Sequence, residues 1–161
     1  MTESREQIAD FSLPASTGQT LGLESFKGKV PLAIVFADLS SDEDRELLDV
    51  LSSHHKDFGN ERSQILVVAR ATAKETRQAS EEEEWSVPIL ADASGAMARD
   101  FGAEDEDGST RRLAVVADKE GRVARRFDPL PIEGDPTGVT EALLYAIRAI
   151  GSGSLGGASN A

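Results

Sequence analysis

Side chains that could do chemistry gather in one short polar stretch. Ser40 and Ser41 offer hydroxyls, and Asp42 and Glu43 offer carboxylates. A carboxylate can act as a general acid or base, whereas a catalytic serine needs a base within hydrogen-bond reach. No histidine lies near either serine in the sequence, so we interpret both serines as helix caps, each three residues before an acidic residue.

Other familiar chemistries are excluded or weakly supported. The chain has no cysteine, which excludes disulfides, thiolate metal sites and thiol catalysis. His54 and His55, the only histidines, point different ways on a helix and lie about 16 Å from Glu43 at a rise of ~1.5 Å per residue. No dinucleotide or phosphate-loop motif is present. We therefore predict no metal site and no cofactor.

Length and charge set the broad class. With 161 residues the chain is long enough for one domain with a substantial core. It carries 17 Lys and Arg against 29 Asp and Glu, a net charge of −12. This excess argues against nucleic acid and anionic membrane surfaces as partners, because both need cationic side chains. The absence of an apolar segment of membrane-spanning length and of a signal-peptide core predicts a cytoplasmic protein.

The elements around the polar stretch predict an α/β fold. Residues 30–36 form an apolar, β-branched run that suits a central strand buried on both faces. After the polar stretch, Leu47, Leu51 and Phe58 recur at helical spacing, which predicts one continuous helix. A loop between the carboxyl end of a strand and a helix is where open α/β folds place their chemistry.

Further patterns predict the remaining elements. Alternation over residues 8–14 predicts an edge strand, and a Pro-rich loop at 128–138 precedes the closing helix. The other predicted strands are 64–69, 111–118 and 122–127, and the other predicted helices are 73–84, 94–101 and 139–150. Residues 151–161 are rich in Gly, Ser, Ala and Asn, so we predict a domain over 1–150 and a disordered tail over 151–161.

Several of these segments, in this order, resemble the peroxiredoxins of the AhpC/TSA (redoxin) family. The resemblance rests on five features of the sequence. They are the opening block over residues 8–29, the aromatic strand end Phe36 before Glu46-Leu47, Pro88 before a short strand ending in Asp92, the aromatic-Gly pair Phe101-Gly102, and Arg112 followed by a strand and Asp118-x-x-Gly121. It covers residues 8–150. It implies a thioredoxin-like three-layer α/β/α fold with an N-terminal β-hairpin extension.

The resemblance also implies a set of site residues. The family's Thr falls on Ser40 and its Pro on Ser41, and the peroxide-reducing Cys falls on Glu43, or on Asp42 if the loop is one residue shorter. The family's active-site Arg falls on Arg112. In an active peroxiredoxin this Arg stabilises the thiolate and binds peroxide. Here we predict that it pairs with Glu43 or Asp42, a charge-assisted contact.

Three apolar residues are expected beside this site. Phe36 ends the strand that leads into the polar stretch, and Val87 and Pro88 belong to the segment that resembles the family's Pro-containing one. In thioredoxin-fold proteins a Pro near this place is often cis and lies against the active-site loop.

The function expected from this combination is a peroxiredoxin-like protein without its nucleophile, acting as a non-catalytic binding or regulatory module. Two alternatives stay open. One is an enzyme that uses Asp42 or Glu43 with Arg112 in the former active-site pocket. The other is a passive subunit of a hetero-oligomer with an active peroxiredoxin. A protein partner or a homo-oligomer fits the family, since its members commonly associate.

Overall fold

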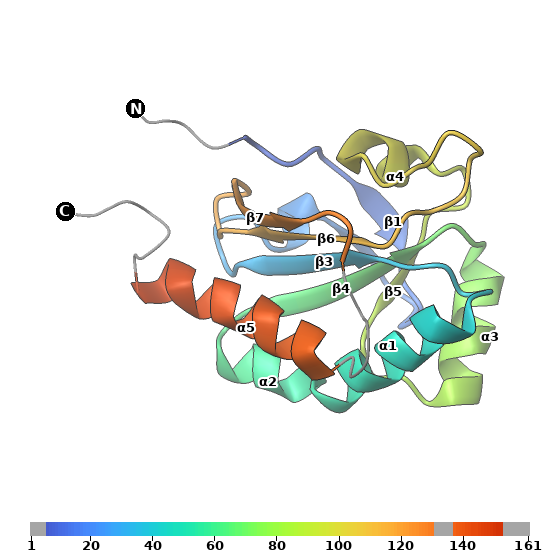
Figure 1. Ribbon diagram of the computed structural model, residues 1–161, viewed down its shortest axis with the longest axis horizontal. Helices are drawn as coiled ribbons and strands as arrows, with labels where there is room; N and C mark the ends of the chain where they lie inside the picture. Colours follow the sequence, from blue (N-terminus) through green and yellow to red (C-terminus); the bar gives the residue numbers. More distant parts are fainter. Residues whose placement is uncertain (1–5, 131–136, 153–161) are drawn as a thin grey trace.

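A computed structural model describes residues 6–130 and 137–152. Its centre is a five-stranded sheet with the strand order β5-β4-β3-β6-β7 (Figure 1). The strands are β3 (Leu32–Phe36), β4 (Gln64–Ala69), β5 (Ile89–Ala91), β6 (Leu113–Ala117) and β7 (Val123–Phe127). The β3–β4 and β4–β5 pairs are parallel, and β6 and β7 run antiparallel to their neighbours.

Helices cover one face of this sheet. They are α1 (Asp42–Ser53), α2 (His55–Asn60), α3 (Ala73–Glu83) and α5 (Thr137–Ser152). Apolar side chains of all four helices join a core cluster with Ala33 and Val35 of β3. Successive residues of a strand point to opposite faces, so Leu32, Ile34 and Phe36 belong to the cluster on the other face.

The second face is covered by α4 (Ala96–Phe101), by the segment around Phe11 and by a short 3₁₀ helix, η1 (Leu23–Ser25). A separate two-stranded sheet joins β1 (Ser12–Pro14) and β2 (Thr20–Gly22) as an antiparallel hairpin. The arrangement confirms the predicted α/β fold: a mixed sheet between two covering layers, with an N-terminal hairpin (Figure 1).

Most predicted elements are present, with two corrections. The helix predicted to run on through Phe58 ends near His54, whose backbone (φ −106°, ψ 14°) separates α1 from α2 and whose ring nitrogen Nδ1 lies 2.9 Å from Asp57 Oδ2. The edge strand predicted over 8–14 is only Ser12–Pro14, because the amide of Ile8 instead donates to the carbonyl of Gly121.

Part of the C-terminal segment lies outside the residues that the structure describes. Helix α5 runs to Ser152, whereas the predicted tail begins at residue 151. Residues 153–161 of that tail lie outside the described residues, as does part of the loop predicted at 128–138.

Candidate functional site

The register of the central sheet brings together two segments that are distant in sequence. Phe36 at the end of β3 is paired with Leu113 at the start of β6. Arg112 therefore lies beside the loop that joins β3 to α1. This loop is the predicted polar stretch, so the fold places its residues and Arg112 at one end of the sheet.

Helix α1 begins as the sequence predicts for one serine but not for the other. Ser41 is the N-cap, and its hydroxyl accepts a hydrogen bond from the amide of Asp44 at 3.2 Å. Ser40 does not cap the helix, because its amide and its hydroxyl both donate to Asp38 Oδ1, at 2.9 and 2.7 Å. Ser40 thus stabilises the loop before α1 rather than the first turn of α1.

The short ion pair at this end of the sheet joins Arg112 to Asp44. Arg112 Nη1 lies 2.8 Å from Asp44 Oδ1, and Arg112 Nε donates to the carbonyl of Leu130 at 3.2 Å. The other Asp44 oxygen, Oδ2, accepts from the amide of Asp38 at 2.8 Å. Asp44 is 3% exposed, so its charge is compensated inside the protein.

The carboxylates predicted to pair with Arg112 are more distant. Glu43 Oε1 lies 3.8 Å from Arg112 Nη1, and its side chain is 75% exposed. Asp42 is exposed and has no ion-pair partner among residues 6–130 and 137–152. The predicted contact with Glu43 exists, therefore, but Asp44 is the nearer partner of Arg112.

Asp44 was missed as a site residue although its sequence position carried a signal. It stands three residues after Ser41, so the pattern predicted that it takes part in capping. Its amide does so. Its side chain turns inward to Arg112 instead, which depends on the pairing of β3 with β6 and is not visible in the local sequence.

The three apolar residues expected beside the site lie in the core. Phe36 is fully buried on the face opposite α1, with its ring 5.4 Å from that of Phe101. Val87 is buried in the cluster beneath α1, and Pro88 immediately precedes the edge strand β5. The cis peptide bond found among the described residues is Asp128–Pro129, not Val87–Pro88.

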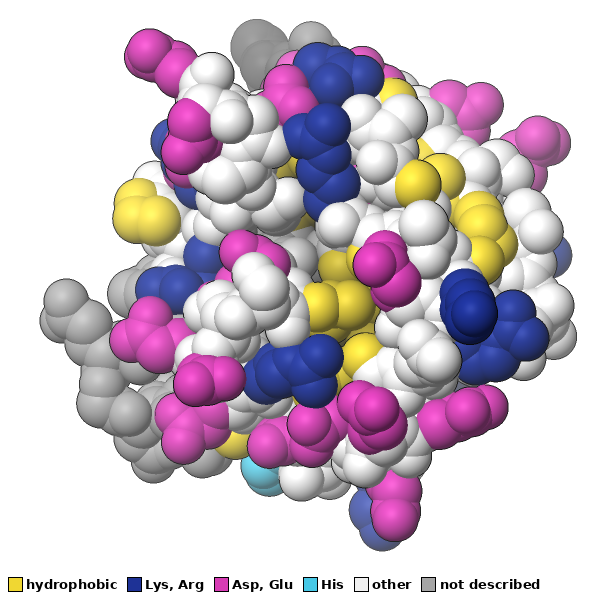
Figure 2. All heavy atoms as spheres, turned by 90° about the vertical axis from the view of Figure 1, so that its right-hand side faces the viewer, with side chains coloured by type: hydrophobic (Ala, Val, Ile, Leu, Met, Phe, Trp, Pro, Cys, Tyr) yellow, Lys and Arg dark blue, Asp and Glu magenta, His cyan; other side chains and the backbone are white. Residues whose placement is uncertain are grey.

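A cavity of about 440 Å³ lies on the other side of the β3–α1 loop, between that loop and α3. Figure 2 shows a hollow with apolar side chains at its base and charged side chains of both signs around it. Of the predicted site residues only Ser40 lines the cavity, and Asp44, which was not predicted, does not line it either. The full lining is Asp38, Leu39, Ser40, Arg45, Arg70, Ala71, Glu75, Gln78, Ala79 and Glu82.

The two arginines of this cavity already have partners. Arg45 Nε donates to the carbonyl of Leu39 at 2.6 Å, its Nη1 lies 3.0 Å from Glu83 Oε2, and its guanidinium lies 5.7 Å from the Trp85 ring centre. Arg70 Nη1 donates to the carbonyl of Gly108 at 2.5 Å and lies 3.2 Å from Glu104 Oε2. Neither guanidinium is therefore an uncompensated charge.

Further features bear on the chemistry that is possible. No cluster of three or more metal-ligating side chains occurs in the part of the chain that the structure describes. Within the same part, no helix combines the length and apolarity needed to cross a membrane. Among residues 6–130 and 137–152, two groups outside both regions have a shifted pKa: hydrogen bonds from Ser109 lower the pKa of Asp107, and burial lowers the pKa of His55.

Comparisons with known proteins agree with this architecture. The AhpC/TSA family matches residues 5–126. Peroxidoxin BcpB from Mycobacterium tuberculosis has a TM-score of 0.79 at 21% identity, with 93% of this chain and 99% of that chain covered. Enterococcus faecalis AhpC has a TM-score of 0.78 at 20% identity, with 95% and 97% covered. No curated protein matches the chain.

Proposed function

The chain belongs to the AhpC/TSA family, and from this premise we propose that it is a member without thiol peroxidase activity that acts as a binding or regulatory module. Thiol-based peroxide reduction needs a cysteine whose sulfur is oxidised to a sulfenic acid. The chain has no cysteine, and a carboxylate cannot replace it in this step. The family resemblance therefore supports an inherited scaffold rather than an inherited reaction.

The observation that carries the proposal is the ion pair between Arg112 and Asp44. In an active member, the resembling Arg serves a thiolate and a peroxide. Here its Nη1 faces a buried carboxylate at 2.8 Å and its Nε faces the Leu130 carbonyl. Two of the three guanidinium nitrogens of Arg112 are thus engaged by the protein itself, and the contact with Asp44 is charge-assisted and stronger than an ordinary hydrogen bond.

A peroxide-consumption assay tests the proposal. Metal-free protein is mixed with hydrogen peroxide and a thiol reductant, with a cysteine-containing peroxiredoxin as the positive control. We expect peroxide consumption at the rate of the same mixture without protein. Sustained turnover by the metal-free protein would overturn the proposal.

The non-thiol enzyme is the less supported alternative. It requires Arg112 and an acid to act on a substrate, but the nearest carboxylate to Arg112 is the buried Asp44, and Glu43 is largely exposed. If such an enzyme existed, replacing Glu43 by Gln would abolish a measurable reaction. An unchanged rate in the Glu43→Gln protein would remove this alternative.

Association and location remain proposals. A passive subunit of a hetero-oligomer predicts that the chain co-purifies with a cysteine-containing homologue, and a homo-oligomer predicts a mass above 17.2 kDa by light scattering. We also propose residues 1–150 as one domain and the cytoplasm as its location. Limited proteolysis and cell fractionation test these two points.

A further inference from the structure

We infer that the cavity between α3 and the β3–α1 loop binds a linear organic cation with ammonium groups at both ends. The inference rests on the proposed binding function and names the class of ligand. It concerns a place separate from the Arg112–Asp44 pair, because neither of these residues lines the cavity.

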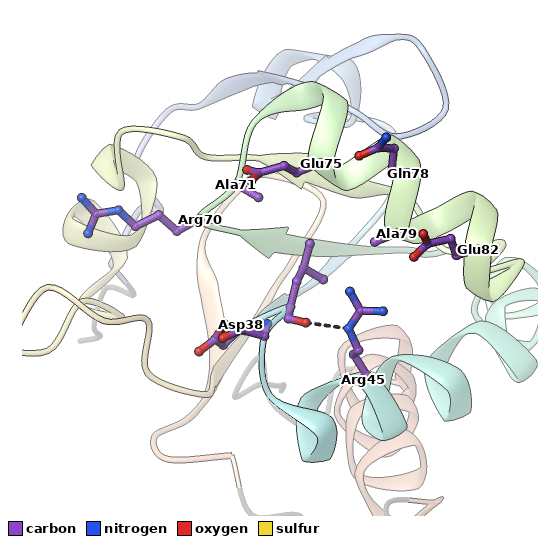
Figure 3. A pocket seen from close by; sticks show the side chains of 10 residues that line it. Asp38, Arg45, Arg70, Ala71, Glu75, Gln78, Ala79 and Glu82 are labelled. Carbon is purple, nitrogen blue, oxygen red and sulfur yellow. Dashed lines mark hydrogen bonds between the residues drawn. The ribbon is translucent and has the colours of Figure 1, made fainter.

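The first argument is size and shape. A volume of about 440 Å³ falls within the range of small-molecule sites, roughly 300–1,000 Å³. Leu39, Ala71 and Ala79 provide apolar lining, while charged and amide side chains provide the rest. Such a site suits a ligand with a methylene chain and polar ends. Figure 3 shows α3 on one side of the space and Asp38 and Arg45 on the other.

The second argument is the sign of the uncompensated charge. Asp38, Glu75 and Glu82 all line the cavity, and none has an ion-pair partner among the described residues. Asp38 and Glu75 each use one oxygen locally, to bind the amides of Ser40 and Thr72. The lining arginines, by contrast, are paired with Glu83 and Glu104. The remaining demand is therefore for positive charge.

The third argument is the position of the acids on α3. Glu75, Gln78, Ala79 and Glu82 lie at helical spacing and share one face of α3. Seven residues at ~1.5 Å place Glu75 and Glu82 about 10 Å apart along the helix axis. Two ammonium groups at a similar separation could contact both acids while the chain between them passes Ala79.

The fourth argument is an electrostatic cost that a cation would relieve. Helix α3 has no basic residue in its last turn and carries acids there instead. Carboxylates at the carboxyl end of a helix are unfavourable, because the helix dipole is negative at that end. Arg45 forms an ion pair with Glu83, but no side chain of the described residues forms one with Glu82. A bound ammonium group would do so.

Isothermal titration calorimetry at low ionic strength tests the inference. The probe is octamethylenediamine, whose extended length is close to the spacing of the two acids. Comparison probes are ethylenediamine, which is too short to span them, and octanedioate, which has the opposite charge. We expect octamethylenediamine to bind more tightly than ethylenediamine and octanedioate not to bind. Binding of octanedioate, or no binding of octamethylenediamine, would overturn the inference.

Two matched variants locate the binding. Glu82 is exposed and forms no hydrogen bond or ion pair with the described residues, so Glu82→Gln should fold normally. It should weaken octamethylenediamine binding about tenfold, as expected for one lost charge-assisted contact. Glu81 is the exposed neighbour that does not line the cavity, and Glu81→Gln should bind as the native chain does. Equal weakening in both variants would show non-specific attraction and overturn the site.

The two proposals fail separately. Peroxide turnover would contradict the proposed function whether or not the diamine binds. Absence of diamine binding, with no peroxide turnover, would contradict only the cavity ligand.

Discussion

Two charged regions lie on either side of the β3–α1 loop, and they differ in how their carboxylates are compensated. At the Arg112–Asp44 pair the acid is buried, and both of its oxygens have partners. In the cavity, Asp38, Glu75 and Glu82 form no ion pair with any described residue, and the two lining arginines are paired with Glu83 and Glu104. In the first region the protein itself compensates the carboxylate, whereas in the second region the carboxylates are accessible to a ligand.

The difference follows from solvent access. A buried carboxylate without a partner is costly, so Asp44 must be compensated within the fold. A carboxylate at an open cavity stays hydrated, so it costs little free energy even when no cation is bound beside it. The comparison therefore predicts that removing charge destabilises the first region and does not destabilise the second.

Replacing Asp44 by Ala should have the largest effect. The change leaves Arg112 without its short ion pair and the Asp38 amide without its acceptor. We expect a loss of about 3 kcal/mol in the free energy of unfolding, at the lower end for a buried pair because the Arg112 side chain is 28% exposed. Urea denaturation measures it.

Glu43→Ala is the matched control for that change. Glu43 precedes Asp44 on α1 but is 75% exposed and 3.8 Å from Arg112. We expect a change within about 0.5 kcal/mol, as for most surface substitutions. Equal losses of unfolding free energy in Asp44→Ala and Glu43→Ala would mean that the Arg112–Asp44 pair contributes no more to stability than the exposed Glu43 does.

A pair of double-mutant cycles should show the next largest difference. The Arg112–Asp44 cycle, with both residues replaced by Ala, should give a coupling energy of roughly 1–3 kcal/mol. The contact of Arg112 with Leu130 is lost in the Arg112 variant and in the double variant, and the contact of Asp44 with Asp38 is lost in the Asp44 variant and in the double variant. Both contacts therefore cancel in the coupling energy. Because both Arg45 and Glu83 are about one-third exposed, their cycle should give about 0.2–1 kcal/mol. Similar values would remove the contrast between the regions.

Sequence patterns predicted the scaffold better than the site. A continuous apolar run predicted the buried strand β4 over Gln64–Ala69. Gly102 ends α4 with a left-handed backbone (φ 78°), as its position after Phe101 indicates. Such features depend on neighbours in sequence. The partner of Arg112 depends instead on which residue of α1 turns inward once β3 pairs with β6, and three consecutive acids leave that choice open.

The cavity was not predicted at all. Its lining comes from the β3–α1 loop, α1, the end of β4 and α3, and the acids of α3 are read from sequence as an exposed helix face. Whether such a face meets water or a hollow depends on how α3 packs beside the loop. Arg45 on α1 shows the same point, since its partner Glu83 lies 38 residues further along the chain.

Neutralising Glu82 should have the opposite sign from removing Asp44. Because Glu82 lies near the carboxyl end of α3 and has no compensating cation among the described residues, Glu82→Gln should raise the free energy of unfolding by about 0.3–0.5 kcal/mol. Glu81→Gln isolates the effect of the helix dipole. An extra gain in Glu82→Gln, decreasing with added salt, would report repulsion within the cavity. A loss of stability would contradict an uncompensated charge.

The smallest predicted effect is a pH dependence of stability that comes from His55, outside both regions. Burial lowers the pKa of His55 below 6.5, so the unfolded chain binds more protons than the folded chain just below that pH. Stability should therefore rise as pH increases toward 6.5 and fall as it decreases, by only a few tenths of a kcal/mol because the ring is half-exposed. His55→Gln should remove this slope in urea titrations at several pH values. A slope that persists in His55→Gln would contradict the assignment to His55.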